Sequence, residues 1–247
     1  MEVKIVLDKK VNLKDHVLVE GFPGIGLVGT IAAGYLVEKR KMTPVGHFYS
    51  DAFPPMTSIH NGRPYFPARI YQDPKANFCV LMAEFVVPSN AVHAISSEIL
   101  RFIKENGIRQ VVSLAGMTSA KEEEKRGIYG IASNDEIADY LKVKKVPLIN
   151  EGITTGVSGV LIAQCAVENF PAMSLLVESK SGEPDPRAAA ELLKKLDSII
   201  GLKVDTGDLL AEAGRIEAQM GKMLEQIKKG KKVYARAEKA GELPMYQ

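Results

Sequence analysis

The clearest chemical pattern in the sequence is a set of three glycines at the spacing of a dinucleotide-binding turn, Gly24, Gly26 and Gly29. They follow an apolar run at 17–19 and open a segment with helical periodicity. Such a turn brings the backbone close to a pyrophosphate at a helix N-terminus, and Asp51 lies about where the ribose-binding acid belongs. The same glycines also suit a tight turn that packs a helix closely on a sheet. Because no phosphate-binding lysine follows, we interpret the turn as structural.

A second glycine turn, at 151–159, repeats the order of strand, turn and helix. It contains Gly156 and Gly159, together with hydroxyl side chains at Thr154, Thr155 and Ser158. These hydroxyls could donate hydrogen bonds to a phosphate or carboxylate, or they could cap the helix, where hydroxyls are preferred. Two glycine-rich helix N-termini on one sheet would form a cleft for an anion, but they do not define a reaction.

Groups that could carry out catalysis are scarce in this sequence. The four histidines lack the spacing of a metal site, and no serine lies in the Gly-x-Ser-x-Gly turn that activates a nucleophile. Glu84 ends a predicted strand and could be a site carboxylate, although a single carboxylate there more often accepts a hydrogen bond from a loop. Cys79 and Cys165 lie in apolar runs and are interpreted as reduced core thiols. We therefore predict no catalytic residue, no metal site, no cofactor and no enzymatic activity.

The elements that would position these turns alternate between strands and helices, which is typical of an α/β domain. Strands are predicted at 3–7, 17–19, 45–49, 69–71, 78–82, 111–114, 129–132, 146–149 and 173–177. Helices are predicted at 27–41, 92–106, 135–141, 157–167 and 186–200. We expect a mainly parallel or mixed sheet with helices on both faces, and an antiparallel excursion at 57–85.

Capping residues mark the helix boundaries. Ser89 or Asn90 is predicted to begin the second helix, Asn134 the third, and Asp185 the last. Residues 51–67 contain four prolines and are predicted to form an irregular loop, with Asn61-Gly62 as its turn signal. In this loop Phe53 and Met56 either form a contact patch on the surface or fold onto the core.

The C-terminal part of the chain departs from this pattern. We divide the sequence into an α/β core domain at 1–203, a helix at 204–229 and an exposed, flexible tail at 230–247. Apolar residues in the helix follow an a/d stripe that includes Ile216, Met220 and Met223. This stripe would pack on its own domain or form a seam against a neighbouring subunit.

The tail carries an excess of positive charge and has no apolar period. Its last residues are Met245, Tyr246 and Gln247, which match a C-terminal docking signal of a hydrophobic residue, a tyrosine and any residue. A partner could capture the terminal carboxylate together with the tyrosine side chain.

The overall composition is that of an ordinary globular protein. The 247 residues are 46% hydrophobic and 25% charged, which excludes a disordered chain. The net charge of +2 gives no general attraction for nucleic acid or for an acidic membrane. No run approaches the roughly 20 apolar residues of a membrane span. We expect a cytoplasmic protein.

Three segments resemble a known family. Residues 19–33 closely resemble the opening motif of the archaeal and bacterial homologues of the second proteasome assembly chaperone, and residues 113–117 and 151–159 are similar to later motifs of that family. The resemblance implies an α/β fold similar to nucleoside phosphorylases, without known catalysis. It also implies homo-oligomers (a ring, pentamer or tetramer) and an archaeal source, since many bacterial members lack the docking tail.

The resemblance further implies a partner and a mechanism. Archaeal members of the family dock on the α-subunits of the 20S proteasome through such tails, as assembly chaperones or ATP-independent activators. Met245, Tyr246 and Gln247 would then be the partner-binding residues. The alternative is a nucleoside- or nucleotide-binding enzyme that uses the turn from Gly24 to Gly29.

Overall fold

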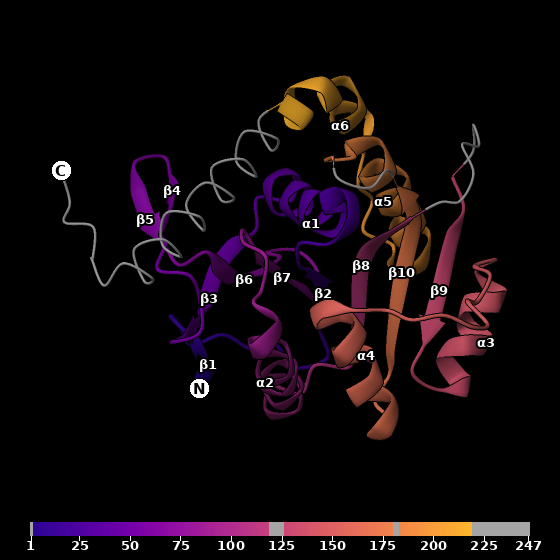
Figure 1. Cartoon of the computed structure of the whole chain (residues 1–247), viewed down its shortest axis with the longest axis horizontal. Coiled ribbons are helices and arrows are strands. Elements are labelled where there is room, and N and C mark those ends of the chain that lie inside the picture. Colours follow the sequence, from indigo (N-terminus) through magenta and orange to yellow (C-terminus); the bar gives the residue numbers. More distant parts are fainter. Residues whose placement is uncertain (1, 119–125, 180–182, 219–247) are drawn as a thin grey trace, which may run out of the picture.

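An eight-stranded mixed sheet forms the centre of the protein (Figure 1). The computed structural model describes residues 2–118, 126–179 and 183–218. The strand order is β1-β3-β6-β7-β2-β8-β10-β9. Four adjacent strands are parallel: β7 (Phe78–Ala83), β2 (Val17–Gly21), β8 (Gln110–Thr118) and β10 (Ala172–Ser179). The flanking strands are antiparallel: β1 (Val3–Leu7), β3 (Thr43–Ser50) and β6 (Ala68–Gln72) on one side and β9 (Ile128–Ala132) on the other. This arrangement confirms the predicted mixed α/β fold and its antiparallel excursion.

Helices cover both faces of the sheet (Figure 1). One face carries α1 (Val28–Lys39), α3 (Asp135–Val143), α5 (Pro186–Ile200) and the short α6 (Gly207–Ala211). The other face carries α2 (Val92–Glu105) and α4 (Gly156–Val167). The protein has two hydrophobic core clusters, one on each face of the sheet. Successive side chains of β2 point into different clusters, because Val17 and Val19 belong to the first, under α1 and α5, and Leu18 belongs to the second, under α2 and α4. Burial on both sides explains why the central strands are apolar runs in the sequence.

Two of the predicted caps are confirmed. The Asn134 side chain accepts a hydrogen bond of 3.0 Å from the Ile137 N–H at the start of α3. The Asp185 side chain accepts one of 3.0 Å from the Ala188 N–H at the start of α5, and Pro186 occupies the first turn. These side chains satisfy N–H groups that have no partner inside the helix.

The prediction for the start of the second helix was wrong. Residues Ser89–Ala91 form a 3₁₀ turn, and Ala91 precedes α2 without a side-chain cap. Neither Ser89 nor Asn90 therefore caps this helix. A tight 3₁₀ turn commonly precedes an α-helix, and here it replaces the capping side chain.

Two predictions about extended segments also need correction. Residues 146–149 form no strand, since their one ladder contact is an isolated bridge between Leu148 and Gly130 of β9. Pro147 has no N–H to donate, which limits pairing at this sheet edge. The segment at 51–67 is not irregular throughout, because β4 (Ser58–His60) and β5 (Arg63–Tyr65) form a hairpin. Its turn is the predicted Asn61-Gly62 pair, both with positive φ.

The first glycine turn allows α1 to approach the sheet at backbone distance. A Cβ added to Gly29 would lie 2.2 Å from the carbonyl oxygen of Leu114 in β8. Gly26 has φ of +61°, and a Cβ there would lie 2.1 Å from Ser179 Oγ. At Gly24, in contrast, a Cβ would meet no atom within 4 Å. Two of the three glycines are thus required by packing.

This difference supplies a matched test. We expect Gly29→Ala to lower the free energy of unfolding by about 1–3 kcal/mol, the usual cost of overpacking, despite the gain of about 1 kcal/mol that alanine brings to a helix. Gly24→Ala should change it by less than about 0.5 kcal/mol, as open surface positions do. Urea denaturation of both variants measures the two values. Equal stability of the two variants would contradict the packing role of Gly29.

Candidate functional site

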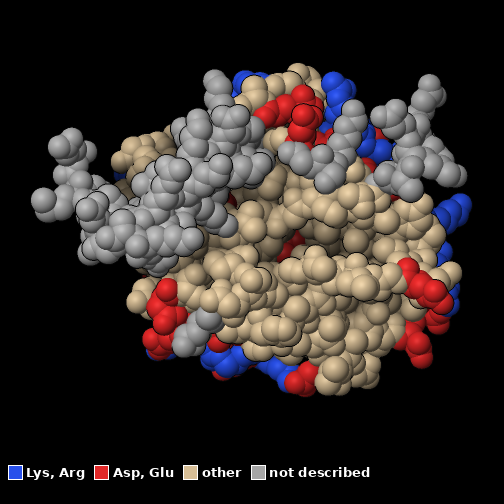
Figure 2. Space-filling view, viewed as in Figure 1, with Lys and Arg blue, Asp and Glu red and all other residues tan. Residues whose placement is uncertain are grey.

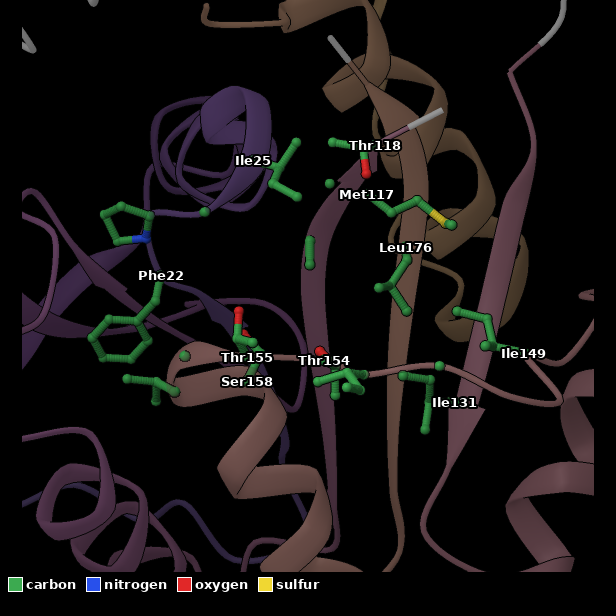
Figure 3. Close-up of a pocket in the computed structure, with 18 of the residues that line it drawn as sticks. Phe22, Ile25, Met117, Thr118, Ile131, Ile149, Thr154, Thr155, Ser158 and Leu176 are labelled. Carbon is green, nitrogen blue, oxygen red and sulfur yellow. The ribbon is translucent and has the colours of Figure 1, made fainter. Parts of the chain in front are cut away.

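A cleft of about 660 Å³ opens at the carboxyl ends of the parallel strands (Figure 3). Its walls come from the turn after β2, the segment after β7, the end of β8 and the loop that leads into α4. Phe22 lies on the opposite side of the cleft from Ile131 and Ile149 (Figure 3). This edge of an open parallel sheet is where α/β proteins commonly bind ligands.

The two glycine turns, which the sequence analysis places on one sheet, meet in this cleft. Gly24 and Gly156 both line it. Thr155 precedes α4, but its side chain makes no capping hydrogen bond, so the capping role considered for this hydroxyl is not observed. Gly159 packs against the backbone of Thr154, where a Cβ would lie 2.9 Å from the carbonyl atoms.

Beneath the cleft lies a fully buried carboxylate, Glu20 of β2. The Ser158 hydroxyl donates to its two oxygens at 2.8 and 3.1 Å, and the Phe22 N–H donates at 2.9 Å. A hydrogen bond from the Ser113 side chain also favours the charged form. Burial outweighs these bonds and raises the pKa of Glu20 above its ordinary value of 4.5.

Sequence reasoning missed Glu20. The only available signal was a charged residue at the end of an otherwise apolar strand, and such a residue usually points to solvent. Its partners Ser113 and Ser158 are 93 and 138 positions away in the chain. Only the parallel pairing of β2 with β8 and the docking of α4 bring the three side chains together.

The electrostatics of the cleft do not suit a nucleotide. Among the described residues that line it, Glu151 is the only charged one, and no lysine, arginine or histidine is present. The first glycine turn is instead held by protein groups, because the Asp185 N–H donates to the Gly26 carbonyl and the Asp185 carboxylate is paired with Arg126 at 3.1 Å. Figure 2 shows charged side chains gathered at the edges of this face and few in its hollowed centre.

Asp51 lies far from the first glycine turn along the sheet. It directly follows β3, which β6 and β7 separate from β2, and its carboxylate accepts a hydrogen bond from the Glu2 N–H. The suggested pairing of this acid with the glycine turn for ribose binding was therefore wrong. Glu84 forms an ion pair with the buried Arg69 and lies 2.9 Å from His60 Nε2, in keeping with its interpretation as an acceptor for neighbouring groups.

The remaining candidate residues fall into two groups. Phe53 and Met56 are partly buried and pack on the second core cluster, with the Phe53 and Phe85 rings 4.8 Å apart. Ile216 packs on the first core cluster. The other candidates lie outside the described residues: Met220, Met223, Met245, Tyr246 and Gln247.

Within the described part of the chain, other chemistry is limited. No group of three or more histidine, cysteine or acidic side chains there could hold a metal ion. Cys79 and Cys165 are free and buried, and burial raises the pKa of Cys165 to about 12. No described helix is long and apolar enough to cross a bilayer.

Comparison with known proteins identifies relatives over nearly the whole chain. A family model described as the PAC2 family matches residues 18–224. An uncharacterized protein of Methanocaldococcus jannaschii is 30% identical over 224 residues, which are 91% of this chain and 92% of that protein. PbaA of Pyrococcus furiosus, described as an archaeal homolog of proteasome-assembly chaperone, is 34% identical with a TM-score of 0.86, over 93% of this chain and 100% of its own.

A second solved structure from the same organism shares the fold. PbaB, described as an archaeal proteasome activator, is 23% identical with a TM-score of 0.73, over 96% of this chain and 99% of its own. The mixed sheet with helices on both faces is therefore common to these proteins.

The buried carboxylate generates a prediction about pH. Because the pKa of Glu20 is higher in the folded than in the unfolded protein, the unfolded chain releases this proton first. The contribution of Glu20 to the free energy of unfolding is thus fully present below about pH 4.5 and falls as the pH rises through the folded-state pKa. Glu20→Gln has no titrating proton at this position, so its stability relative to the native protein should increase as the pH rises above about 4.5.

Urea denaturation at several pH values measures this difference, with Glu217→Gln as an exposed control. A stability difference between Glu20→Gln and the native protein that stays constant with pH would contradict the assignment.

Proposed function

The chain belongs to the PAC2 family, and we propose from this membership that it assists the assembly of the proteasome or activates the assembled particle. The observation that carries the proposal is the similarity to PbaA, which extends over almost all of both chains at 34% identity. An archaeal source fits the relatives, since PbaA is itself described as archaeal. Action on the proteasome in a cytoplasmic compartment is part of this proposal.

The proposed mechanism is docking of the C-terminal tail on the α-ring of the 20S proteasome. Tyr246 would enter a pocket between neighbouring α-subunits, Met245 would pack at its mouth, and the Gln247 carboxylate would pair with a basic side chain. Tyrosine suits such an anchor because its rigid ring buries a large apolar area and its hydroxyl finds a hydrogen-bond partner.

Several tails on one homo-oligomer would act together. A single short tail buries little surface and should bind weakly, but linked tails raise the overall affinity by about 10²–10⁴ when their reach matches the pocket spacing. Residues 230–244 would span at most about 50 Å when fully extended. This reach would let each tail find a pocket even where the symmetries of the two rings differ.

The competing function is a nucleoside- or nucleotide-binding enzyme, and the site does not favour it. The cleft at the glycine turns offers no described cationic side chain to a phosphate, and it lies directly above the Glu20 carboxylate. The close contacts at Gly26 and Gly29 account for the glycine spacing without a ligand. We therefore propose no enzymatic role.

Tyr246→Ala should abolish detectable binding to the 20S proteasome without changing the melting temperature or the oligomeric state. A single hot-spot truncation commonly costs about 2 kcal/mol or more, and the loss is repeated in every tail of the oligomer. Surface plasmon resonance on immobilised 20S particles measures the binding. Tyr234→Ala is the matched control, since it removes the same side chain from the same tail outside the motif. Native affinity of Tyr246→Ala would rule out tail docking.

The a/d stripe supplies a second prediction, about self-association. Ile216 packs on its own core, so the seam against another subunit would be formed by residues farther along the stripe, such as Met220 and Met223. Met223→Glu would place a charge in that seam, at a cost of several kcal/mol if it is buried. Light scattering should show a smaller particle, whereas Lys222→Glu, off the stripe, should keep the native mass. An unchanged mass for Met223→Glu would exclude it from the interface.

A further inference from the structure

The proposed tail docking does not use the cleft at the carboxyl ends of the parallel strands, yet this cleft carries an unusual polar group. Glu20 is 0% exposed, and within the described part of the chain no lysine or arginine forms an ion pair with it. Its partners are two serine hydroxyls and a backbone N–H. A buried carboxylate without a cation is costly, and a purely structural position would be filled more cheaply by an amide or an apolar side chain.

Ser158 connects this carboxylate to the cleft. It lines the cleft and is partly exposed, while Glu20 lies directly behind it. The Ser158 hydroxyl has one proton, and it donates that proton to the Glu20 carboxylate at 2.8 Å. The lone pairs of Ser158 Oγ therefore remain to accept a hydrogen bond from the cleft side. The pair presents an acceptor with a carboxylate behind it, which suits an N–H donor.

The rest of the cleft wall combines apolar and polar side chains. Phe22, Ile25, Val86, Met117, Ile149 and Leu176 supply much of its apolar part, and Thr118, Asn150, Glu151, Thr154 and Thr155 supply polar groups. Its volume of about 660 Å³ lies in the range of small-molecule sites, which typically combine apolar walls with a few polar groups that fix orientation. An occupant must therefore bury an apolar body as well as satisfy the Ser158–Glu20 pair.

The charge of the cleft decides which polar group fits. Glu151 is the only charged residue among the described residues of the wall, and Glu20 adds a second carboxylate beneath it. An anionic ligand would meet like charge without a cation to offset it, whereas an amino group would meet opposite charge. Charge complementarity thus favours an amine over a phosphate or a carboxylic acid.

We propose that this cleft binds a small molecule that joins an apolar body to an amino group, and that Ser158 and Glu20 receive the amino group. Ser158 Oγ accepts a hydrogen bond from the amine, and the positive charge of the amine in turn favours the ionised form of the Glu20 carboxyl behind the serine. The proposed ligand site does not involve the tail, so a negative result for ligand binding would not count against proteasome docking.

Three probes with one apolar body test the proposal on the full chain: 2-phenylethylamine, 2-phenylethanol and phenylacetate. Binding is titrated by protein NMR, with the methyl signal of Met117 reporting occupancy of the cleft. The amine should bind at least about tenfold more tightly than phenylacetate, because the cleft carboxylates attract its positive charge and repel the negative charge of phenylacetate. The uncharged alcohol should bind with an affinity between the two. Equal or tighter binding of phenylacetate, or no shift of the Met117 signal with the amine, would overturn the proposal.

Two variants then test the receiving pair. Glu20→Gln keeps the shape of the side chain and should lower the amine affinity at least about tenfold while leaving the alcohol affinity nearly unchanged. Ser158→Ala removes the accepting hydroxyl, so it tests the same pair if Glu20→Gln does not fold. Glu217→Gln, an exposed glutamate, is the matched control and should bind the amine as the native protein does. Amine affinity that persists in both pair variants would overturn the assignment, as would tighter binding of ATP than of the amine.

Discussion

The four central strands are covered by helices on both faces, so polar side chains on them depend on hydrogen-bond partners inside the protein, and Ser174 of β10 is an exception because its buried hydroxyl has none among the described residues. This constraint makes most residues of these strands apolar. Glu20, near the end of β2, is the clearest case of such a dependence, because it is satisfied by serines from β8 and α4. The cleft above it exists because the loops that leave these strands diverge toward helices on opposite faces.

The glycine turns follow from the same burial. A helix that packs on a strand at backbone distance admits no side chain at the contact, and Gly29 against the Leu114 carbonyl is such a contact. A pattern that resembles a phosphate-binding loop therefore arises from close packing alone. The chemistry around it supports this interpretation, since Asp185 and Ser179 adjoin Gly26 and the nearby Arg126 is paired with the Asp185 carboxylate. The same turn places Phe22 and Ile25 on the cleft wall, which gives the opening an apolar character.

Local signals in the chain predicted most elements correctly. Asn134 and Asp185 cap their helices because the geometry of a cap depends on three or four neighbouring residues, which are adjacent in the sequence. The Asn61-Gly62 turn formed for the same reason. The errors came where a local signal competed with its surroundings. Residues 146–149 have a strand-like composition, but Pro147 lacks the N–H that a ladder at the sheet edge needs.

The sequence by itself determined the alternation of strands and helices, an α/β fold with a mainly parallel or mixed sheet and, through its motifs, the family. These properties are periodic or local, so they can be recognised from neighbouring residues. Only the tertiary structure decided that Asp51 lies apart from the first turn, that Ile216 packs on its own core and that Glu20 meets Ser158 beneath a cleft. Each of these depends on strand order or helix docking, which bring together residues that are far apart in the chain. A single sequence does not show which of its distant residues meet in the folded protein.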